Sequence, residues 1–350
     1  MAGNPHIASI AVAVPPYSAD QAFAEEFVKK HYSDRLDKRS LHLLHTFFQH
    51  PSIRKRHFAI DDPMELVDEG PDRRIARYTS RAIELSMEAV TRALELAKVK
   101  VGEVTGLVLN TCTGYICPGV STYLIERLGL RRDILTFDLV GSGCGGAIPN
   151  LQAAEALVKA HGGVVLSVSV EICSATLQMD NDLSLLLSNA LFADGAAAAV
   201  IWDRPKGWNL VGSASRYVPE QRESIRYVHK QGQLHNQLSL RLPDLVKKAA
   251  AEVVKDILGR RALSISDIAH WALHNGGENI INAVQKEVGI PESHIQSTRK
   301  VLSEFGNMSS PTVWFVMNEI QQERVAAGDW CVMIAYGAGL SAHAYLLQKA

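Results

Sequence analysis

The stretch GSGCGGAIPNLQAAEALVKA, residues 141–160, places one cysteine among four glycines directly before a helix-like run. A strand-like segment, ILTFDLV at 134–140, precedes it, so Cys144 is predicted at or near a helix N-terminus. Backbone N–H groups and the helix dipole stabilise a thiolate at such a position. The glycines permit a tight turn and let a substrate approach the backbone closely. The alternative is a strand-to-helix turn with an incidental cysteine.

Helix-like and strand-like segments alternate through most of the chain. Apolar residues recur at helical spacing from 82 to 99, while Pro243 and Gly259 bound a second predicted helix. Near-continuous apolar strands are typical of a sheet covered on both faces, which predicts an α/β fold. Such strands are predicted at 104–110, 134–140, 163–170, 196–202, 268–273 and 329–337.

A motif repeated at a constant offset suggests a duplicated architecture. The strand-to-glycine junction LVLNTCTG at 107–114 has a counterpart in HWALHNGG at 270–277, an offset of 163 residues. The same offset carries Cys144 onto Asn307. We therefore predict two similar halves, residues 1–205 and 206–350, which meet near these side chains.

Composition narrows the class of protein. With 36 basic and 37 acidic residues in 350, the formal charge of −1 gives no electrostatic argument for a nucleic-acid or membrane partner. No apolar run reaches the ~20 residues of a membrane helix. The opening MAGNPHIASIAVAVPP lacks a secretory signal pattern, so we expect a cytoplasmic location. Five cysteines without CxxC spacing argue against a disulfide framework and against a metal site.

A catalytic cysteine needs a group that takes its proton and often a third polar group. Among 13 histidines, His274 stands out because it ends an apolar strand and precedes the flexible Asn275-Gly276-Gly277. We expect its ring at the mouth of a cleft, with a hydrogen-bonded strand-end histidine as the alternative. Asn307, in EFGNMSSP, is a candidate cap of the following helix.

Together these segments resemble the motifs of the type III polyketide synthases, the chalcone and stilbene synthase family. The resemblance spans about residues 50–345 and rests on five segments: CTGYICPGVSTYLIERLGL, FDLVGSGCGGAIPNLQAAEAL, NALFADGAAAAVI, HWALHNGGENII and EFGNMSSPTVWFVMNE. It implies a thiolase-like fold of two related αβαβα halves in five layers, and a homodimer.

The resemblance also implies a chemistry. Cys144 matches the acyl-carrying nucleophile and His274 its ion-pair partner, while Asn307 with His274 matches the pair that binds the thioester enolate. The implied substrates are an acyl-CoA starter and malonyl-CoA. Loss of carbon dioxide generates the nucleophile, so neither a metal nor a cofactor is needed, and donors aimed at the enolate oxygen lower the barrier.

Further positions match the substrate cavity of the family. Phe192 matches the gatekeeping phenylalanine between the coenzyme A tunnel and the interior, with a core aromatic as the alternative. Cys117-Pro118 resembles the segment by which one subunit reaches toward its partner's cavity. The cavity-lining positions are Cys112, Thr113, Cys173, Thr176 and Ser309.

The sequence departs from the family pattern in three places. Asn275 replaces the usual proline after the histidine, and residues 335–340 read AYGAGL where the family has GFGPGL. The basic residues that hold coenzyme A phosphates are unmatched in LHLLHTFFQHPS at 41–52. Arg54, Lys55 and Arg56 are therefore candidates for phosphate contact, with a solvated surface as an equal alternative.

The segment at 220–246 resembles bacterial members that use fatty acyl starters to make alkylresorcinols and alkylpyrones. Aldol closure of the chain gives a resorcinol, whereas attack by an enol oxygen gives a pyrone. Two competing functions remain open. A β-ketoacyl-acyl carrier protein synthase III shares the fold and the Cys-His-Asn set but typically follows its histidine with Gln-Ala-Asn, and a non-catalytic scaffold of the same fold is the other.

Overall fold

The computed structural model describes residues 4–350, whose main sheet has nine strands in two arms. Along the sheet the first arm runs β5-β4-β6-β7-β1 and the second runs β8-β13-β12-β11. The first arm comprises β1 (His6–Ala13), β4 (Val104–Asn110), β5 (Leu135–Leu139), β6 (Val164–Ile172) and β7 (Asp194–Trp202). The second comprises β8 (Trp208–Tyr217), β11 (Ile268–Leu273), β12 (Trp330–Gly337) and β13 (Ser341–Lys349).

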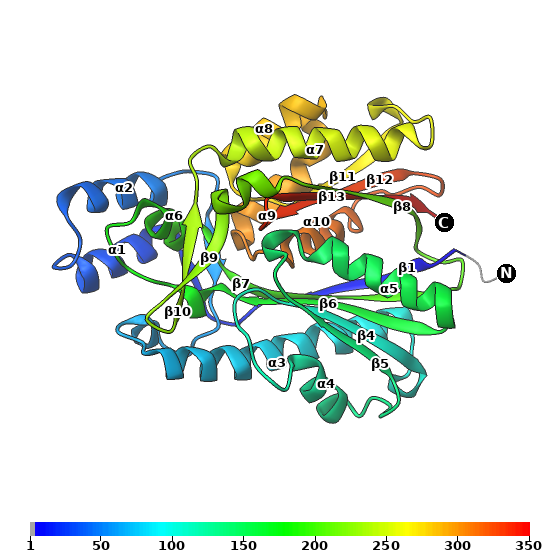
Figure 1. Cartoon of the computed structure of the whole chain (residues 1–350), viewed down its shortest axis with the longest axis horizontal. Helices are drawn as coiled ribbons and strands as arrows, with labels where there is room; N and C mark the ends of the chain where they lie inside the picture. The colour runs from blue at the N-terminus through cyan, green and yellow to red at the C-terminus, as the bar shows by residue number, and fades with distance from the viewer. Residues whose placement is uncertain (1–3) are drawn as a thin grey trace.

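The arms join where β1 pairs with β8, in the middle of the strand order, and diverge from this junction. Strands β1 and β8 pair only through His6 and Ile7, close to the two ends of the described chain. Figure 1 shows the arms separating from this junction. Strand order repeats between them, since β4, β6, β7 and β1 take the places of β11, β12, β13 and β8. Strand β5 has no counterpart in the second arm, so it is an edge strand.

Ten α-helices cover the sheet and fill the space between its arms. They are α1 (Gln21–Tyr32), α2 (Lys38–Phe48), α3 (Pro71–Ala97), α4 (Val120–Leu128), α5 (Ala147–His161), α6 (Leu183–Leu191), α7 (Leu242–Gly259), α8 (Glu278–Val288), α9 (Gln296–Phe305) and α10 (Thr312–Ile320). This count refers to residues 4–350.

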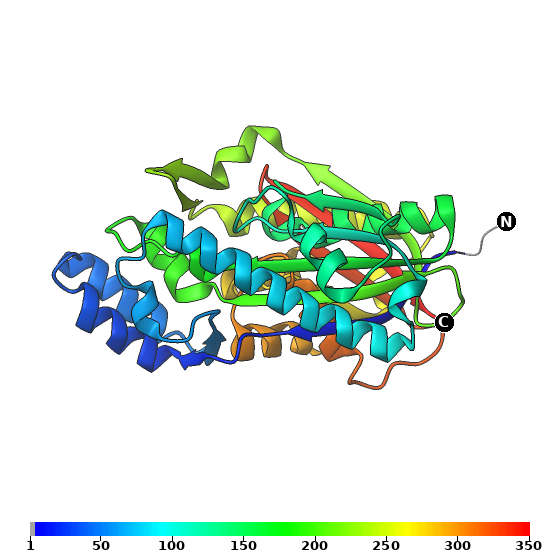
Figure 2. The same ribbon diagram turned by 90° about the horizontal axis from the view of Figure 1, so that it is seen from below.

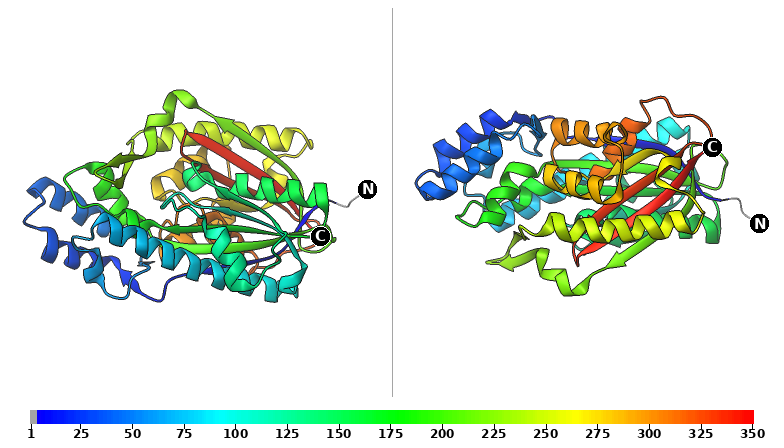
Figure 3. Two further views of the ribbon diagram at one scale, coloured as in Figure 1. Left: turned by 60° about the horizontal axis from the view of Figure 1, so that its bottom comes forward. Right: turned by 90° about the horizontal axis from the view of Figure 1, so that it is seen from above.

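Three hydrophobic cores create five layers. The central core joins α5 and α10 to strands of both arms. A second core packs α3 and α4 on the outer face of the first arm, where Figure 2 shows α3 lying across the strands. A third packs α7 and α8 on the second arm, as the right view of Figure 3 shows for α7. Strands such as β7, buried along their whole length, are apolar on both faces for this reason.

Two small sheets and a helical end complete the molecule. Strands β2 (Ser18–Asp20) and β3 (Lys55–His57) pair beside α1 and α2, and β9 (Ile225–Lys230) pairs with β10 (Gln233–Leu238) in a hairpin. Within residues 4–350, no helix is both long enough and apolar enough to cross a membrane. The thiolase-like α/β fold expected from the sequence is thus confirmed, while the boundary at 205/206 stays a prediction.

Candidate active site

Cys144 lies on a single 3₁₀ turn, Gly143–Gly145, between β5 and α5. The turn is pressed against the end of β12: a Cβ added at Gly145 would lie 3.2 Å from the backbone nitrogen of Gly337. Gly143 has φ 56°, a left-handed conformation that favours glycine. The glycines therefore let the turn pack against the neighbouring strand, a need that the sequence alone did not reveal.

The thiol of Cys144 is buried and accepts a hydrogen bond from a serine. Ser309 Oγ lies 3.2 Å from its sulfur, and Ser309 itself has φ 58°, an uncommon conformation for a residue with a side chain. Burial raises the pKa of Cys144 to about 12, although the Ser309 hydrogen bond opposes this shift. The resting group is therefore a thiol.

His274 follows β11 and is 1 % exposed. Burial lowers the pKa of its imidazole to about 3, so the ring is neutral at rest. The Tyr336 hydroxyl donates to the His274 carbonyl, and the two rings meet edge to face with centroids 5.3 Å apart. His274 Nδ1 has no hydrogen-bond partner among the described residues. No hydrogen bond in that part of the chain joins His274 to Cys144, so their ion pair stays a prediction.

Asn307 has an orientation that its hydrogen bonds define. Its Oδ1 accepts from the Ser309 backbone N–H at 2.8 Å and lies 3.5 Å from Thr312 Oγ1. Because the oxygen is engaged, the amide nitrogen is available to donate toward the cavity. Asn307 does not cap α10, whose N-cap residue is Pro311. The capping role considered from the sequence is therefore incorrect.

Backbone and side-chain hydrogen bonds hold these groups together. Phe192 and Asn307 form an isolated parallel β-bridge, in which the Asn307 N–H donates to Leu191 O at 3.0 Å. Asn275, the departure from the family's proline, donates from Nδ2 to Gly306 O at 3.3 Å. The segments that carry His274, Phe192 and Asn307 are thus tied to one another.

One cavity of about 340 Å³ brings the predicted site together. Cys144, Phe192, His274 and Asn307 all line it, although they come from both arms of the molecule. Its remaining walls are largely apolar and include Leu187, Leu191, Leu238, Leu240, Leu242, Pro243 and Val246. A nucleophile and two polar side chains that line one largely apolar cavity can carry out acyl transfer with stabilisation of an oxyanion.

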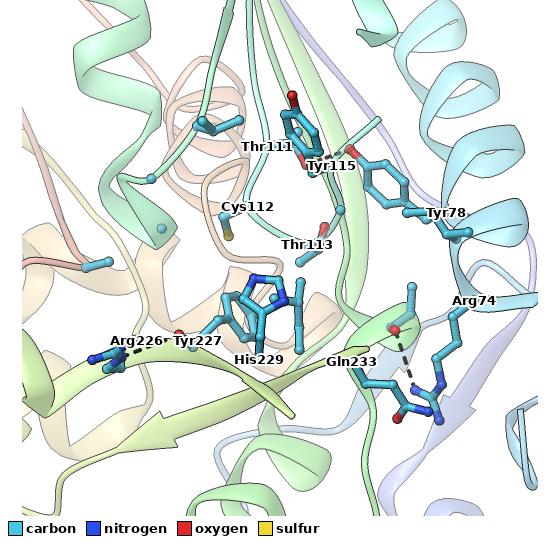
Figure 4. Close-up of a pocket in the computed structure, with 18 of the residues that line it drawn as sticks. Arg74, Tyr78, Thr111, Cys112, Thr113, Tyr115, Arg226, Tyr227, His229 and Gln233 are labelled. Atoms are coloured by element: carbon cyan, nitrogen blue, oxygen red, sulfur yellow. Dashed lines mark hydrogen bonds between the residues drawn. The ribbon is translucent and has the colours of Figure 1, made fainter. Parts of the chain in front are cut away.

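A larger cavity of about 910 Å³ adjoins the turn that carries Cys144, since Gly143 and Ala338 line it. Cys112 and Thr113 line it, and Figure 4 shows both near Tyr227 and His229 of β9. Ser309 Oγ lies 3.4 Å from Cys112 Sγ as well as 3.2 Å from the sulfur of Cys144. Ser309 therefore stands between the two cavities.

Cys173 and Thr176 lie elsewhere. They border a void of about 20 Å³ that Phe192 also lines. The hydroxyl of Tyr227 lies 3.5 Å from Thr176 Oγ1 and occupies the adjoining space. The cavity residues expected from the sequence are thus not brought together. Cys112 and Thr113 line the 910 Å³ cavity, Cys173 and Thr176 border the small void, and Ser309 is not among the described residues that line either space or the 340 Å³ cavity.

The structure corrects the expectation for Arg56. Its side chain is 2 % exposed, and it donates to three oxygens of the protein, so it is not available to a phosphate. Arg54 pairs with Glu304, and Lys55 Nζ lies 3.8 Å from the same carboxylate. None of the three is among the described residues that line the 340 Å³ cavity.

Sequence reasoning missed Glu171, a fully buried carboxyl group at the end of β6. Its oxygens accept from the Cys112 N–H at 2.9 Å, from Thr113 Oγ1 at 2.8 Å and from Ser310 Oγ at 2.6 Å. Burial raises its pKa, which these hydrogen bonds oppose. A single acidic residue closing the apolar run GVVLSVSVEI was the available signal.

Comparison with known proteins identifies the family. Residues 15–221 match the family described as FAE1/type III polyketide synthase-like protein, and residues 209–350 match the C-terminal domain of chalcone and stilbene synthases. A 3,5-dihydroxyphenylacetyl-CoA synthase of Streptomyces toyocaensis is 29 % identical over 87 % of this chain and 82 % of its own. A 1,3,6,8-tetrahydroxynaphthalene synthase of Streptomyces peucetius subsp. caesius is 28 % identical over 98 % of this chain and 92 % of its own.

Solved structures agree as well. PKS-I from the brown alga Ectocarpus siliculosus superposes with a TM-score of 0.92 at 26 % identity, covering 100 % of this chain and 99 % of that one. The 1,3,6,8-tetrahydroxynaphthalene synthase of Streptomyces coelicolor A3(2) superposes with a TM-score of 0.90 over 99 % of this chain and 100 % of that one; at 23 % identity it supports the fold alone. Matching along nearly its whole length, this chain belongs to the type III polyketide synthases, the chalcone and stilbene synthase family of acyltransferases.

Proposed function

We propose that Cys144 takes an acyl group from a coenzyme A starter and that His274 and Asn307 promote decarboxylation of malonyl-CoA to extend it. The observation that carries the proposal is the single 340 Å³ cavity lined by all three side chains. The Cys144 thiol attacks the starter thioester, its proton passes to His274, and coenzyme A leaves with that proton.

Extension follows from the same geometry. Malonyl-CoA loses carbon dioxide, and the negative charge that develops on its thioester oxygen receives hydrogen bonds from the Asn307 amide and from His274. The enolate carbon attacks the Cys144 thioester and releases the thiolate of Cys144, so the chain is lengthened by two carbons and now stands as a coenzyme A thioester. Cys144 attacks this thioester, takes back the lengthened chain and releases coenzyme A, which begins the next round. Preorganised donors of this kind stabilise the developing charge most in a site that excludes water. We propose that coenzyme A thioesters are the substrates and that no cofactor or metal takes part.

A short starter is the first candidate. The void beside Cys173 and Thr176 measures about 20 Å³, room for about one water molecule. The two relatives are named for dihydroxyphenylacetyl-CoA and tetrahydroxynaphthalene, which lack a long alkyl chain. The fatty acyl starter expected from the sequence is the second candidate, favoured by the apolar leucine-rich wall of the 340 Å³ cavity and by the size of the 910 Å³ cavity that Cys112 and Thr113 line. Closure gives a resorcinol-type ring by aldol chemistry or a pyrone through an enol oxygen.

We also propose a homodimer that pairs through the edge strand β5. Phe137 is 48 % exposed and Leu135 is 41 % exposed on this strand, and Val140 beyond it is 59 % exposed. Exposed apolar side chains on an edge strand are typical of an association surface. The cytoplasmic location expected from the sequence stays a prediction.

Mass spectrometry of products tests the function and the starter together. The purified protein is incubated with malonyl-CoA alone and with a series of acyl-CoA starters, beside Cys144→Ala. The proposal expects aromatic or pyrone products that vanish in the variant, with the highest yield from short starters. Preference for long chains would select the second candidate. Extension of carrier-protein thioesters alone would favour a β-ketoacyl-acyl carrier protein synthase III, and no extension from either donor would favour a scaffold.

A further inference from the structure

Arg56 is a buried cation whose charge no carboxylate neutralises by direct contact among the described residues. It donates from Nε to Gln21 Oε1 at 3.0 Å, and from Nη1 to Asn189 O at 2.7 Å and Phe192 O at 2.8 Å. Burial lowers its pKa to about 9, a shift that the negative charge of Asp194 opposes. Burying a guanidinium costs free energy unless its hydrogen bonds compensate for the lost hydration. The acceptors of Arg56 therefore indicate its role.

The two backbone acceptors, Asn189 O and Phe192 O, lie at the C-terminal end of α6. The last carbonyls of a helix lack partners within the helix, and each buried one needs a donor from elsewhere. Here Asn189 O and Phe192 O receive Arg56, Ala190 O receives Gln21 Nε2 at 3.0 Å, and Leu191 O receives the Asn307 N–H at 3.0 Å. A cation at this end also interacts favourably with the negative end of the helix dipole.

Asn307 is therefore held by the same helix end that Arg56 and Gln21 hold. The Ala193 N–H returns a bond of 2.9 Å to Asn307 O, completing the bridge between the two segments. The aliphatic part of Arg56 also packs on the turn before Asn307, since a Cβ at Gly306 would lie 2.8 Å from Arg56 Cγ.

We infer that Arg56 and Gln21 form a brace that positions the Phe192 side chain and the Asn307 amide opposite Cys144, which makes Arg56 a positioning residue for malonyl-CoA decarboxylation. This rests on the proposed function. Cys144 stands on the turn before α5, outside the brace, so the brace controls enolate stabilisation and leaves the nucleophile in place.

The test compares Arg56→Met with the unmodified full-length protein in two assays. Decarboxylation of malonyl-CoA reports on Asn307 and His274, and site-resolved alkylation by iodoacetamide reports on Cys144. We expect kcat for decarboxylation to fall about tenfold to a hundredfold, since a misplacement of about 1 Å costs about that much, with KM for malonyl-CoA changed less than about threefold. The alkylation rate of Cys144 stays unchanged.

Three further variants keep the test decisive. Arg56→Lys retains the charge but not the forked geometry, so it recovers part of the lost kcat. Gln21→Met removes the hydrogen bond to Ala190 O without removing the cation, and we expect it to lower kcat as well. It takes the place of Arg56→Met if that variant does not fold. Arg260→Met is the matched control. Arg260 directly follows α7, is exposed, and donates to the carbonyl oxygen of Ser213.

Wild-type kcat in folded Arg56→Met, or in both Arg56→Lys and Gln21→Met, would overturn the brace. So would loss of Cys144 alkylation in step with decarboxylation, because that pattern indicates a general distortion. A wild-type protein that fails to decarboxylate malonyl-CoA would instead contradict the proposed function.

Discussion

At the residue scale, the site is built from groups that burial keeps neutral. The pKa of Cys144 is raised to about 12 and that of His274 is lowered to about 3, in both cases mainly by desolvation. A neutral thiol beside a neutral imidazole is a poor nucleophile until the proton moves. Acyl loading therefore includes transfer of the Cys144 proton to His274.

The pH dependence of Cys144 alkylation follows from that state. Thiolate is the reactive form, and below the raised pKa its fraction grows about tenfold for each pH unit. The iodoacetamide rate at Cys144, followed by peptide mass spectrometry, is expected to keep rising between about pH 7 and pH 9. A rate that is already constant across this range would mean that Cys144 and His274 form an ion pair at rest.

The amide of Asn307 supplies a donor that a carboxylate cannot replace. In Asn307→Asp an acceptor faces the enolate oxygen, and the charge repels it. We expect malonyl-CoA decarboxylation to fall by about 10²–10³, the usual effect of losing an oxyanion donor. Alkylation of Cys144 is the control and stays near the wild-type rate. Retention of decarboxylation in this variant would remove Asn307 from the mechanism.

At the element scale, the turn that carries Cys144 depends on its contact with β12. A Cβ at Gly337 would overlap Ser142 O and Gly145 N, so the last residue of β12 has to be glycine for the turn to lie where it does. The contact between Gly145 and Gly337 is thus explained from both sides.

Gly337→Ala is expected to displace this turn. Overpacking of this kind costs about 1–3 kcal/mol, and the condensation rate should fall further than stability alone explains. Chemical denaturation and product formation measure the two effects. Gly212→Ala is the control, because nothing lies within 4 Å of a Cβ there, and its stability should change by less than about 0.5 kcal/mol. Equal behaviour of the two variants would show that the turn tolerates movement.

At the scale of the whole molecule, the alternation of segments and the motif echo predicted the α/β architecture. Predicted strands 104–110 and 268–273 coincide with β4 and β11. Arg56 could not be predicted as buried, because its backbone acceptors lie 133 and 136 residues away. Glu171 is similar, since Ser310 is 139 residues from it. Local pattern identifies elements, whereas the burial of a charge depends on partners that only the assembled layers supply.

The exposed edge of the first arm predicts the oligomeric state. Phe137→Lys on β5 is expected to separate the dimer into monomers, because a charge on an edge strand opposes pairing. Light scattering after size-exclusion chromatography measures this. Leu96→Lys is the control, since Leu96 is 62 % exposed on α3. A monomeric wild type would contradict pairing through β5.

Intact-protein and peptide mass spectrometry of the protein caught during turnover shows directly whether Cys144 carries the growing chain. With malonyl-CoA and a starter, we expect adducts on the peptide that carries Cys144, in a series whose members differ by one C₂H₂O unit. Cys144→Ala should show none of them. Released condensed product without any adduct on Cys144, or the same series on another cysteine, would contradict the assignment of Cys144 as the residue that carries the growing chain.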